Sequence, residues 1–240
     1  MATERRHVPD HLVSALVARL APRVLRHTLV LAIGVCVLLG CSTARHPVHP
    51  ELRSAAEQQS ALDVSDALEA LIAEGKDTAT DREFAYQVVK AHDGDTAAST
   101  YARAAITGRL VQQKGLLGAN MVDDVERDAR RSRDLDPDFR DGAATRLLGT
   151  LYVLAPAALL EHGDSESGLV LLERLVQAHP DALENHLRVA EAYIALNDPA
   201  PAAPHVCRCL AGESALRPDD RLLLAHLVAV AGIPKCPPGR

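Results

Sequence analysis

The chain has 240 residues, of which 48% are hydrophobic and only 2% aromatic, with no tryptophan. A core of Leu, Ala and Val suits close-packed helices better than a β-sandwich, which draws on aromatic and β-branched residues. The net charge is −6, and residues 1–40 hold five Arg against Glu4 and Asp10, so the remaining residues carry −9. Such an acidic chain has too few cations to neutralise phosphates, which excludes nucleic acid as a partner.

The N-terminal segment has the pattern of an export signal. Residues 28–39 form an apolar run of twelve, too short for a membrane-spanning helix, which needs about 20 residues. Basic side chains precede the run, as in a signal peptide: Arg19, Arg23, Arg26 and His27. The run ends in Leu38-Leu39-Gly40-Cys41, which resembles the bacterial lipobox, where the Cys thiol takes a diacylglycerol and the small residue before it admits the peptidase. We therefore predict a lipoprotein signal peptide over residues 1–40 and lipidation of Cys41.

The sequence after Cys41 predicts three further regions. Residues 41–60 are polar and contain proline, which is typical of a flexible tether. A helical domain is predicted over residues 61–235 and a tail over residues 236–240. Ser42 follows the Cys where an Asp would favour retention in the inner membrane. The expected location is the outer membrane, with the domain lipid-anchored and facing the periplasm.

Start and stop signals divide the first half of the domain into helices. The predicted starts are Asp63 or Ser65, a Thr80-x2-Glu83 capping box, Asp95 and Asn120, and the matching ends include Glu74 before Gly75, and Ala91. The helix after Asn120 is charged on most faces, with a thin apolar line of Val122, Val125 and Ala129. We expect it to lie on the outside of the domain.

The second half continues in the same way. A helix carrying Leu148 and Tyr152 is predicted to stop at Pro156, and Asp181-x2-Glu184 to cap the start of another. Three prolines, Pro199, Pro201 and Pro204, crowd the following helix, so an irregular start is expected there. The last predicted helix, residues 219–231, would close the array as a C-terminal cap.

A repeated spacing runs through these helices. Leu148-Gly149-x2-Tyr152 is followed by Gly168, Leu172 and Pro180, and Val189-Ala190-x2-Tyr193 by Ala202 and Val206; Val125, Ala129 and Pro137 show the same spacing upstream. This is the tetratricopeptide (TPR) pattern of paired helices. The predicted fold is all-α: a stack of TPR-like antiparallel helix pairs, an α-solenoid-like array.

Motifs of catalysis are missing from the sequence. It contains no Gly-x-Ser-x-Gly, no His-Glu-x2-His and no glycine-rich phosphate loop. We therefore predict a non-enzymatic protein that requires neither a cofactor nor a metal.

The C-terminal cysteines leave three interpretations open. A disulfide from Cys207 or Cys209 to Cys236 is favoured, because the predicted compartment is oxidising. Free thiols are the second interpretation. A metal site at His205-x-Cys207-x-Cys209 is the third, but residues two apart on a helix point to different faces, so a shared metal would require the helix to break.

Four side chains are candidates for lining a central pocket or pore: Arg109, Arg146, Tyr152 and Tyr101. A cation beside apolar walls can hold an anionic ligand. The alternative, which we favour, is an arginine that reaches the surface and a tyrosine in its core position in the repeat.

Several motifs together resemble one known family. They are Leu135-Asp136-Pro137-x-Phe139, Arg146-Leu147-Leu148-Gly149-x2-Tyr152-x3-Pro156, Gly163-Asp164, Gly168-x3-Leu172 and Gly108-Arg109-Leu110. With the lipidated signal, the chain is similar to the T-component of TPR-protein-associated TRAP transporters. The resemblance implies TPR-like helix pairs around a hydrophobic pore, a homo-oligomer, and docking of the periplasmic solute-binding protein of a TRAP transporter. The prolines of residues 199–204 and the cysteines of the C-terminus depart from that family.

The function expected from these features is a binding and assembly module in solute uptake. The alternative is a generic TPR scaffold lipoprotein for envelope assembly or secretion machinery.

Overall fold

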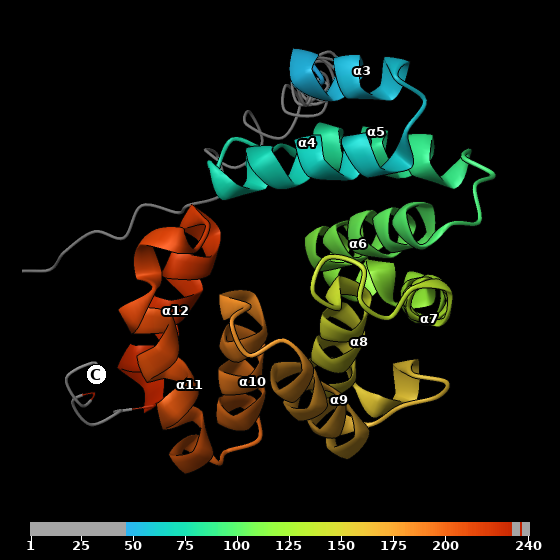
Figure 1. Ribbon diagram of the computed structural model, residues 1–240. Helices are drawn as coiled ribbons and strands as arrows, with labels where there is room; N and C mark the ends of the chain where they lie inside the picture. Colours follow the sequence, from blue (N-terminus) through green and yellow to red (C-terminus); the bar gives the residue numbers. More distant parts are fainter. Residues whose placement is uncertain (1–46, 232–235, 237–240) are drawn as a thin grey trace, which may run out of the picture. The chain divides into compact units, whose positions relative to one another are not determined.

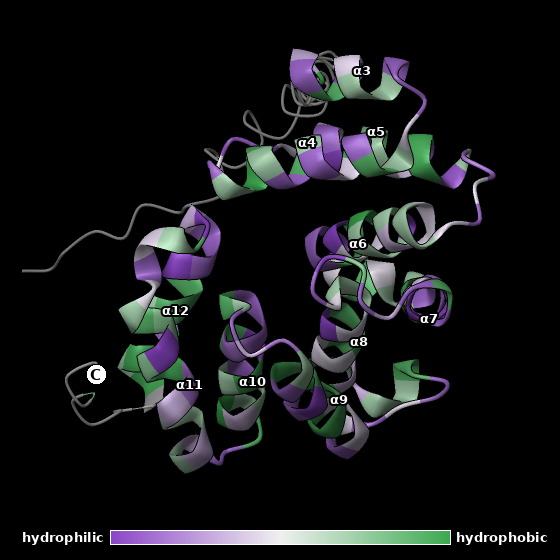
Figure 2. Ribbon diagram, viewed as in Figure 1, coloured by the Kyte–Doolittle hydropathy of each residue, from purple (hydrophilic) through white to green (hydrophobic). Residues whose placement is uncertain are grey.

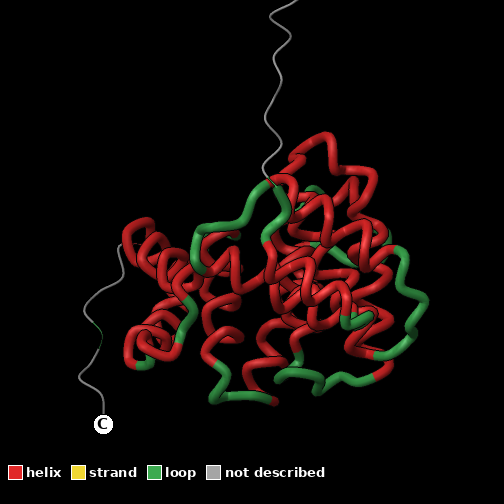
Figure 3. Tube along the Cα trace, turned by 90° about the horizontal axis from the view of Figure 1, so that it is seen from above, coloured by secondary structure: helices red, strands yellow, loops and turns green. Residues whose placement is uncertain are grey.

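The computed structural model describes residues 47–231 and Cys236. All the described residues belong to one compact unit. The predicted signal peptide and Cys41 lie outside the described residues. The described part is helical and contains no strand (Figure 3). No helix in it has the length and apolar character needed to cross a membrane.

The helices follow one another with short connections (Figure 1). They are α3 (Pro50–Glu57), α4 (Ala61–Ala73), α5 (Ala79–Lys90), α6 (Ala97–Lys114), α7 (Val122–Leu135), α8 (Ala143–Leu154), α9 (Ser165–Ala178), α10 (Leu183–Ala195), α11 (Pro199–Ala211) and α12 (Pro218–Ala231). Short 3-10 helices join some of them: η1 (Gly115–Met121), η2 (Ala157–Leu159) and η3 (Glu213–Ala215).

The prediction of a flexible tether over residues 41–60 is wrong for residues 50–57, which form α3. Pro50 stands in the first turn, where its missing N–H costs no hydrogen bond. Leu52 is fully buried in a core cluster with side chains of α4, α5 and α6. Just before the helix, His49 donates its backbone N–H to Asp81 at 2.9 Å, and its ring lies 2.8 Å from the other oxygen of that carboxylate. The helical domain therefore begins before residue 61.

Three predicted helix starts are displaced by a few residues. Ser60 caps α4, Thr96 caps α6, and Thr78 with Asp81 forms the capping box of α5 in place of Thr80 and Glu83. Thr78-x2-Asp81 has the same spacing as the predicted box, so the local pattern does not choose between them. Asp81 also accepts two hydrogen bonds from His49, which lies 32 residues away. A contact remote in sequence thus favours the earlier start.

Three expectations about later helix starts are also wrong. Neither Asn120 nor Asp181 caps a helix, since α7 continues from η1, and the N-cap residue of α10 is Ala182, which makes no side-chain bond. An irregular start was expected near the three prolines, but α11 is a regular helix that begins at Pro199. Pro199 and Pro201 stand in its first turn, where backbone N–H groups have no partner within the helix. Only Pro204, inside α11, removes a helical hydrogen bond.

Helices packed in adjacent pairs make up the domain. The strongest pairings are α6 with α7, α8 with α9, and α10 with α11. The even-numbered helices also contact one another in a closed circuit: α4 with α6, α6 with α8, α8 with α10, α10 with α12, and α12 with α4. The odd-numbered helices α5, α7, α9 and α11 pack against their even-numbered neighbours (Figure 1). The predicted terminal cap, α12, therefore contacts one of the first helices as well as α10 and α11.

The core is divided into several clusters along this circuit. One cluster is formed by side chains of α3, α4, α5 and α6, and another lies between α10, α11 and α12. Two smaller clusters lie between α6, α7 and α8 and between α8, α9 and α10. Leucine, alanine and valine supply most of the buried side chains. Hydrophobic and hydrophilic residues are interspersed along the helices (Figure 2), as expected for helices that bury one face and expose the other.

Two glycines of the repeat spacing set the distance between α8 and α9. A Cβ added at Gly149 would lie 2.7 Å from Leu172 Cγ and 3.0 Å from the carbonyl oxygen of Gly168. A Cβ added at Gly168 would lie 2.8 Å from the carbonyl oxygen of Gly149 and 2.7 Å from Tyr152 Cβ. The helix backbones therefore approach each other directly, which requires the small residues that the spacing predicts.

We expect Gly168→Ala to destabilise the protein by about 2 kcal/mol, because the new Cβ meets a backbone oxygen that cannot rotate away. The matched control is Gly108→Ala in α6, where the nearest atom, Val125 Cγ1, lies 3.9 Å from the added Cβ. This control should be neutral or stabilising by up to about 1 kcal/mol, since alanine favours the helix. Urea unfolding of both variants measures the difference. Equal stabilities would contradict the close approach of α8 and α9.

Candidate functional site

Polar side chains bridge four of the five junctions of the helix circuit: α4–α6, α4–α12, α10–α12 and α8–α10. At the α4–α6 junction, the Glu69 carboxylate accepts two hydrogen bonds of 2.6 Å from Arg109. At the α4–α12 junction, Arg217, the residue before α12, donates to the same carboxylate at 2.9 Å and to Asp219 at 2.8 Å. Glu69 and Arg109 keep 17% and 23% of their side-chain surface exposed. These four residues, Glu69, Arg109, Arg217 and Asp219, form what we call the closing network.

Burial and charge oppose each other at Glu69. Burial alone would raise the pKa of its carboxyl, but the hydrogen bonds and charges of Arg109 and Arg217 outweigh it and lower the pKa below its usual value. The carboxylate therefore stays ionised at neutral pH. The same balance lowers the pKa of Asp219, where burial is opposed chiefly by Arg217. The closing network is thus a set of ion pairs at neutral pH.

The α10–α12 junction has an ion pair of its own. Arg188 donates to Asp220 at 2.9 Å and to Glu191 at 2.9 Å. Asp220 is 5% exposed, and burial raises its pKa in spite of the nearby Arg188. Both guanidinium partners of Arg188 are carboxylates, so its charge is compensated.

The α8–α10 junction is joined without a carboxylate. Arg146 donates to the side-chain oxygen of Asn185 at 2.6 Å, and Asn185 donates to the carbonyl oxygen of Asp141 at 3.1 Å. Tyr101 of α6 lies near enough to Arg146 for the guanidinium to influence its pKa. Burial raises that pKa, so the phenol stays protonated at neutral pH. The Tyr101 ring also packs against Phe139, with ring centroids 5.7 Å apart.

Three of the four predicted lining residues lie on two neighbouring helices of the circuit: Tyr101 and Arg109 on α6 and Arg146 on α8. All three are partly exposed, and the charges of both arginines influence the Tyr101 hydroxyl. Their partners Glu69, Asn185 and Arg217 were not predicted, because no local pattern points to residues that meet only after folding. Of these three partners, only Asn185 lies near a feature that the sequence analysis singled out. It is fully buried in α10, the helix whose start was predicted at Asp181.

Tyr152, the fourth predicted residue, lies elsewhere. It is 3% exposed in a core cluster between α6, α7 and α8. Its hydroxyl donates to the buried Glu126 at 2.7 Å, and Glu126 also accepts the backbone N–H groups of Glu161 and His162. Burial and the bond to Glu126 raise the pKa of Tyr152 to about 12. The Glu126 carboxylate thus fastens the loop after η2 to α7, and Tyr152 of α8 donates to the same carboxylate.

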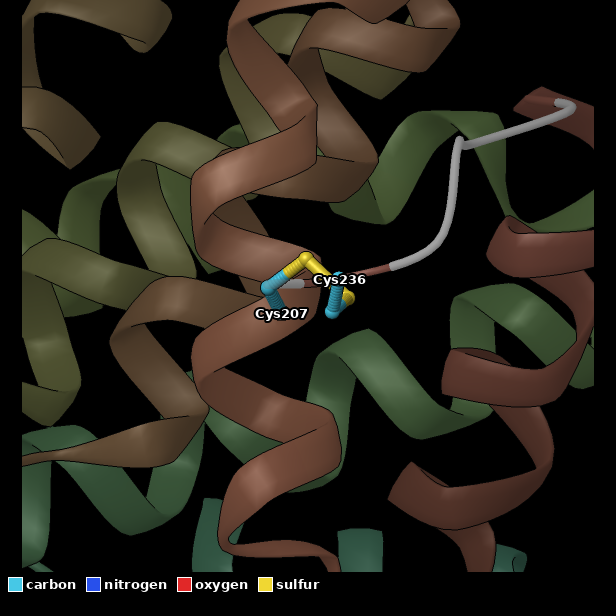
Figure 4. Close-up of a disulfide and its surroundings, with 2 residues drawn as sticks. All are labelled: Cys207 and Cys236. Atoms are coloured by element: carbon cyan, nitrogen blue, oxygen red, sulfur yellow. A yellow bond between two sulfur atoms is a disulfide. The ribbon is translucent and has the colours of Figure 1, made fainter. Parts of the chain in front are cut away.

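The C-terminal cysteines have separate fates. A disulfide joins Cys207 of α11 to Cys236 (Figure 4). Cys209 is a buried free thiol whose Sγ lies 3.5 Å from the carbonyl oxygen of Leu183. Burial, followed by the charges of Asp220 and Glu184, raises its pKa to about 12. A thiol so far from ionisation is a poor nucleophile and a poor metal ligand.

His205 is turned toward His186 of α10, with the two Nδ1 atoms 2.9 Å apart. The structure therefore contradicts the third interpretation of the cysteine region, in which His205, Cys207 and Cys209 hold a metal. Each of the three side chains has a different partner, as expected for residues two apart on a regular helix. Within the described residues, no group of three or more His, Cys, Asp or Glu side chains is placed to hold a metal ion.

Comparison with known proteins adds no relative. No family model matches the chain, and no curated protein is significantly similar to it.

The histidine pair predicts a pH dependence of stability. His186 Nε2 lies 2.8 Å from the carbonyl oxygen of Pro180 and must donate there, so neutral His186 accepts at Nδ1 from His205. Burial, and then the charge of His186, lowers the pKa of His205. The folded state therefore prefers neutral His205, and this contribution is complete above the unfolded value of about 6.5 and is lost as the pH falls below it.

We expect the parent to lose about 1 kcal/mol more stability than His205→Gln between about pH 7.5 and pH 5.5. This window lies above the titration range of most carboxyl groups. His226→Gln, which changes an exposed histidine of α12, is the control and should follow the parent. Urea unfolding at several pH values makes the comparison, and parallel curves for the parent and His205→Gln would contradict the assignment.

Proposed function

We propose that the protein is a lipid-anchored component of the cell envelope that acts as a non-enzymatic binding and assembly module. Its partner is the periplasmic solute-binding protein of a TRAP transporter, and the anchor is a diacylglycerol on Cys41 in the outer membrane. The proposal rests on the lipobox at residues 38–41 and on the TPR-like spacing of the helices.

The observation that carries the proposal is the crossing of α8 and α9. Gly149 and Gly168, both predicted by the TPR spacing, stand where the two backbones meet. Leu148 and Leu172, which flank them, are fully buried. Arrays of such helix pairs present extended surfaces to other proteins, which suits a module whose task is assembly.

The next pair of helices supports the same interpretation. Ala190 of α10 and Ala202 of α11 are fully buried in the cluster where these helices pack. Val206 occupies the large apolar position that follows in the repeat and is also fully buried. The burial of these residues at the α10–α11 contact, like that of the glycines at α8–α9, supports the proposed TPR-like array.

We expect crosslinking in the native host, followed by affinity purification and mass spectrometry, to recover a periplasmic solute-binding protein. Recovery of outer-membrane assembly or secretion proteins alone would overturn this partner and favour a scaffold role.

The anchor is tested in the same cells. Cys41→Ser should abolish labelling by radioactive palmitate and release the protein from the membrane fraction. Cys209→Ser, which changes a thiol buried in the domain, is the matched control and should remain labelled. Undiminished labelling of Cys41→Ser would contradict lipidation at this residue.

A further inference from the structure

Two consecutive leucines in η1, between α6 and α7, are the most exposed large hydrophobic side chains among the described residues. Leu116 is 92% exposed and Leu117 is 86% exposed. The next most exposed, Leu222 of α12, is 74% exposed and has no other exposed large hydrophobic residue beside it in the sequence. Single exposed leucines are common on soluble proteins, whereas a contiguous exposed pair marks a surface that contacts another apolar phase.

The turn that presents this leucine pair is shaped by a glycine on either side. Gly115 has a φ of +56°, in the left-handed region that favours glycine. A Cβ added at Gly118 would lie 3.0 Å from Val111 Cα in the last turn of α6, so η1 packs directly on the helix backbone. Met121, at the end of the turn, is buried. Residues 115–122 contain no charged side chain, so this segment can approach hydrocarbon without burying a charge.

Contacts of α5 join the leucine pair to the beginning of the described domain. Near the start of α5, Asp81 accepts a hydrogen bond of 2.9 Å from the backbone N–H of His49. Two residues further on, Glu83 forms an ion pair with Lys114, the last residue of α6. Lys114 directly precedes the turn that carries the leucines. The first five residues of α5 therefore contact both the start of the domain and the end of the helix that leads to the pair.

The chain before the domain limits how far the domain can move from an anchored Cys41. His49 follows Cys41 by eight residues, and an extended chain spans at most about 3.5 Å per residue, or about 28 Å in all. With a diacylglycerol on Cys41, the start of α5 stays within this reach of the bilayer surface. The leucine pair, joined to the same part of α5, is thereby held where a lipid surface is available to it.

We propose that Leu116 and Leu117 insert into the phospholipid surface to which Cys41 is anchored, so that the protein contacts the membrane at two points. The inference rests on the lipid anchor of the proposed function and adds an orientation to it. Burial of each leucine favours the inserted state by roughly tenfold or more. The anchor makes insertion an intramolecular step, so a contact too weak to bind a free protein suffices. One face of the domain is then held toward the membrane.

The chain has no tryptophan, so a single introduced one reports its own surroundings. The test uses the full lipoprotein, purified in detergent and reconstituted into vesicles of phosphatidylcholine and phosphatidylglycerol, with or without bromine on the acyl chains. We expect the emission of Leu117→Trp to shift to shorter wavelength in the vesicles. Brominated lipid should reduce this emission by about half or more, because interfacial apolar side chains lie about 5–10 Å deep.

Leu196→Trp is the matched control. Leu196 is another exposed leucine and directly follows α10. The connection between α10 and α11 lies at the end of the domain remote from α3 and α5 (Figure 1), so brominated lipid should leave the emission of Leu196→Trp unchanged. Adding Leu116→Asp to Leu117→Trp should remove the quenching, because a carboxylate resists transfer out of water.

Three results would overturn the proposal. Emission of Leu117→Trp that stays at the aqueous wavelength would place the pair in water. A shift to shorter wavelength without quenching would assign the pair to a contact with a second copy or another protein. Equal quenching of Leu117→Trp and Leu196→Trp would indicate a general association with lipid.

The intact mass of the same samples reports whether Cys41 carries the lipid, independently of the fluorescence. A lipidated protein without quenching would overturn insertion and leave the anchor. Quenching in a chain that lacks the lipid would support insertion and contradict the anchor. Neither measurement depends on recovering a solute-binding protein, so this proposal and the proposed function can fail separately.

Discussion

The carboxylate of Glu69 is the contact on which the arrangement of the helices depends. It receives Arg109 from α6 and Arg217 from the start of α12, a residue 148 positions further along the chain. An array of helix pairs stacked only on sequence neighbours has no reason to bring its last helix to one of its first. Here the ion pairs and the contact of α12 with α4 join the two ends, so the circuit of even-numbered helices is closed.

Closure has a consequence for the polar side chains of the even-numbered helices. Tyr101, Arg146 and Asn185 lie on three successive members of the circuit, α6, α8 and α10, and their relative positions depend on how these helices pack. Arg109 belongs both to α6 and to the closing network, so the network holds the helix that carries Tyr101. The closing network and the Arg146–Asn185 contact therefore both depend on the packing of the even-numbered helices.

The sequence predicts most helices and one helix crossing, because these depend on neighbours along the chain. Gly149 and Gly168 are an example, since their spacing reflects the contact of two consecutive helices. The capping box of α5 could not be placed, because Thr78 and Thr80 fit the local pattern equally and the choice is favoured by His49. Of the site, Arg109, Arg146 and Tyr101 were candidates, but Glu69 and Arg217 carry no signal, because their partners are remote in sequence.

A double-mutant cycle between Glu69 and Arg217 tests the closing of the circuit most directly. Urea unfolding of Glu69→Gln, Arg217→Gln and the double variant gives their coupling free energy. We predict about 1 kcal/mol or more, because Glu69 is largely buried, and less than about 0.5 kcal/mol for the exposed pair Arg140 and Asp66. Additive effects of the two substitutions would contradict the closing of α12 on α4.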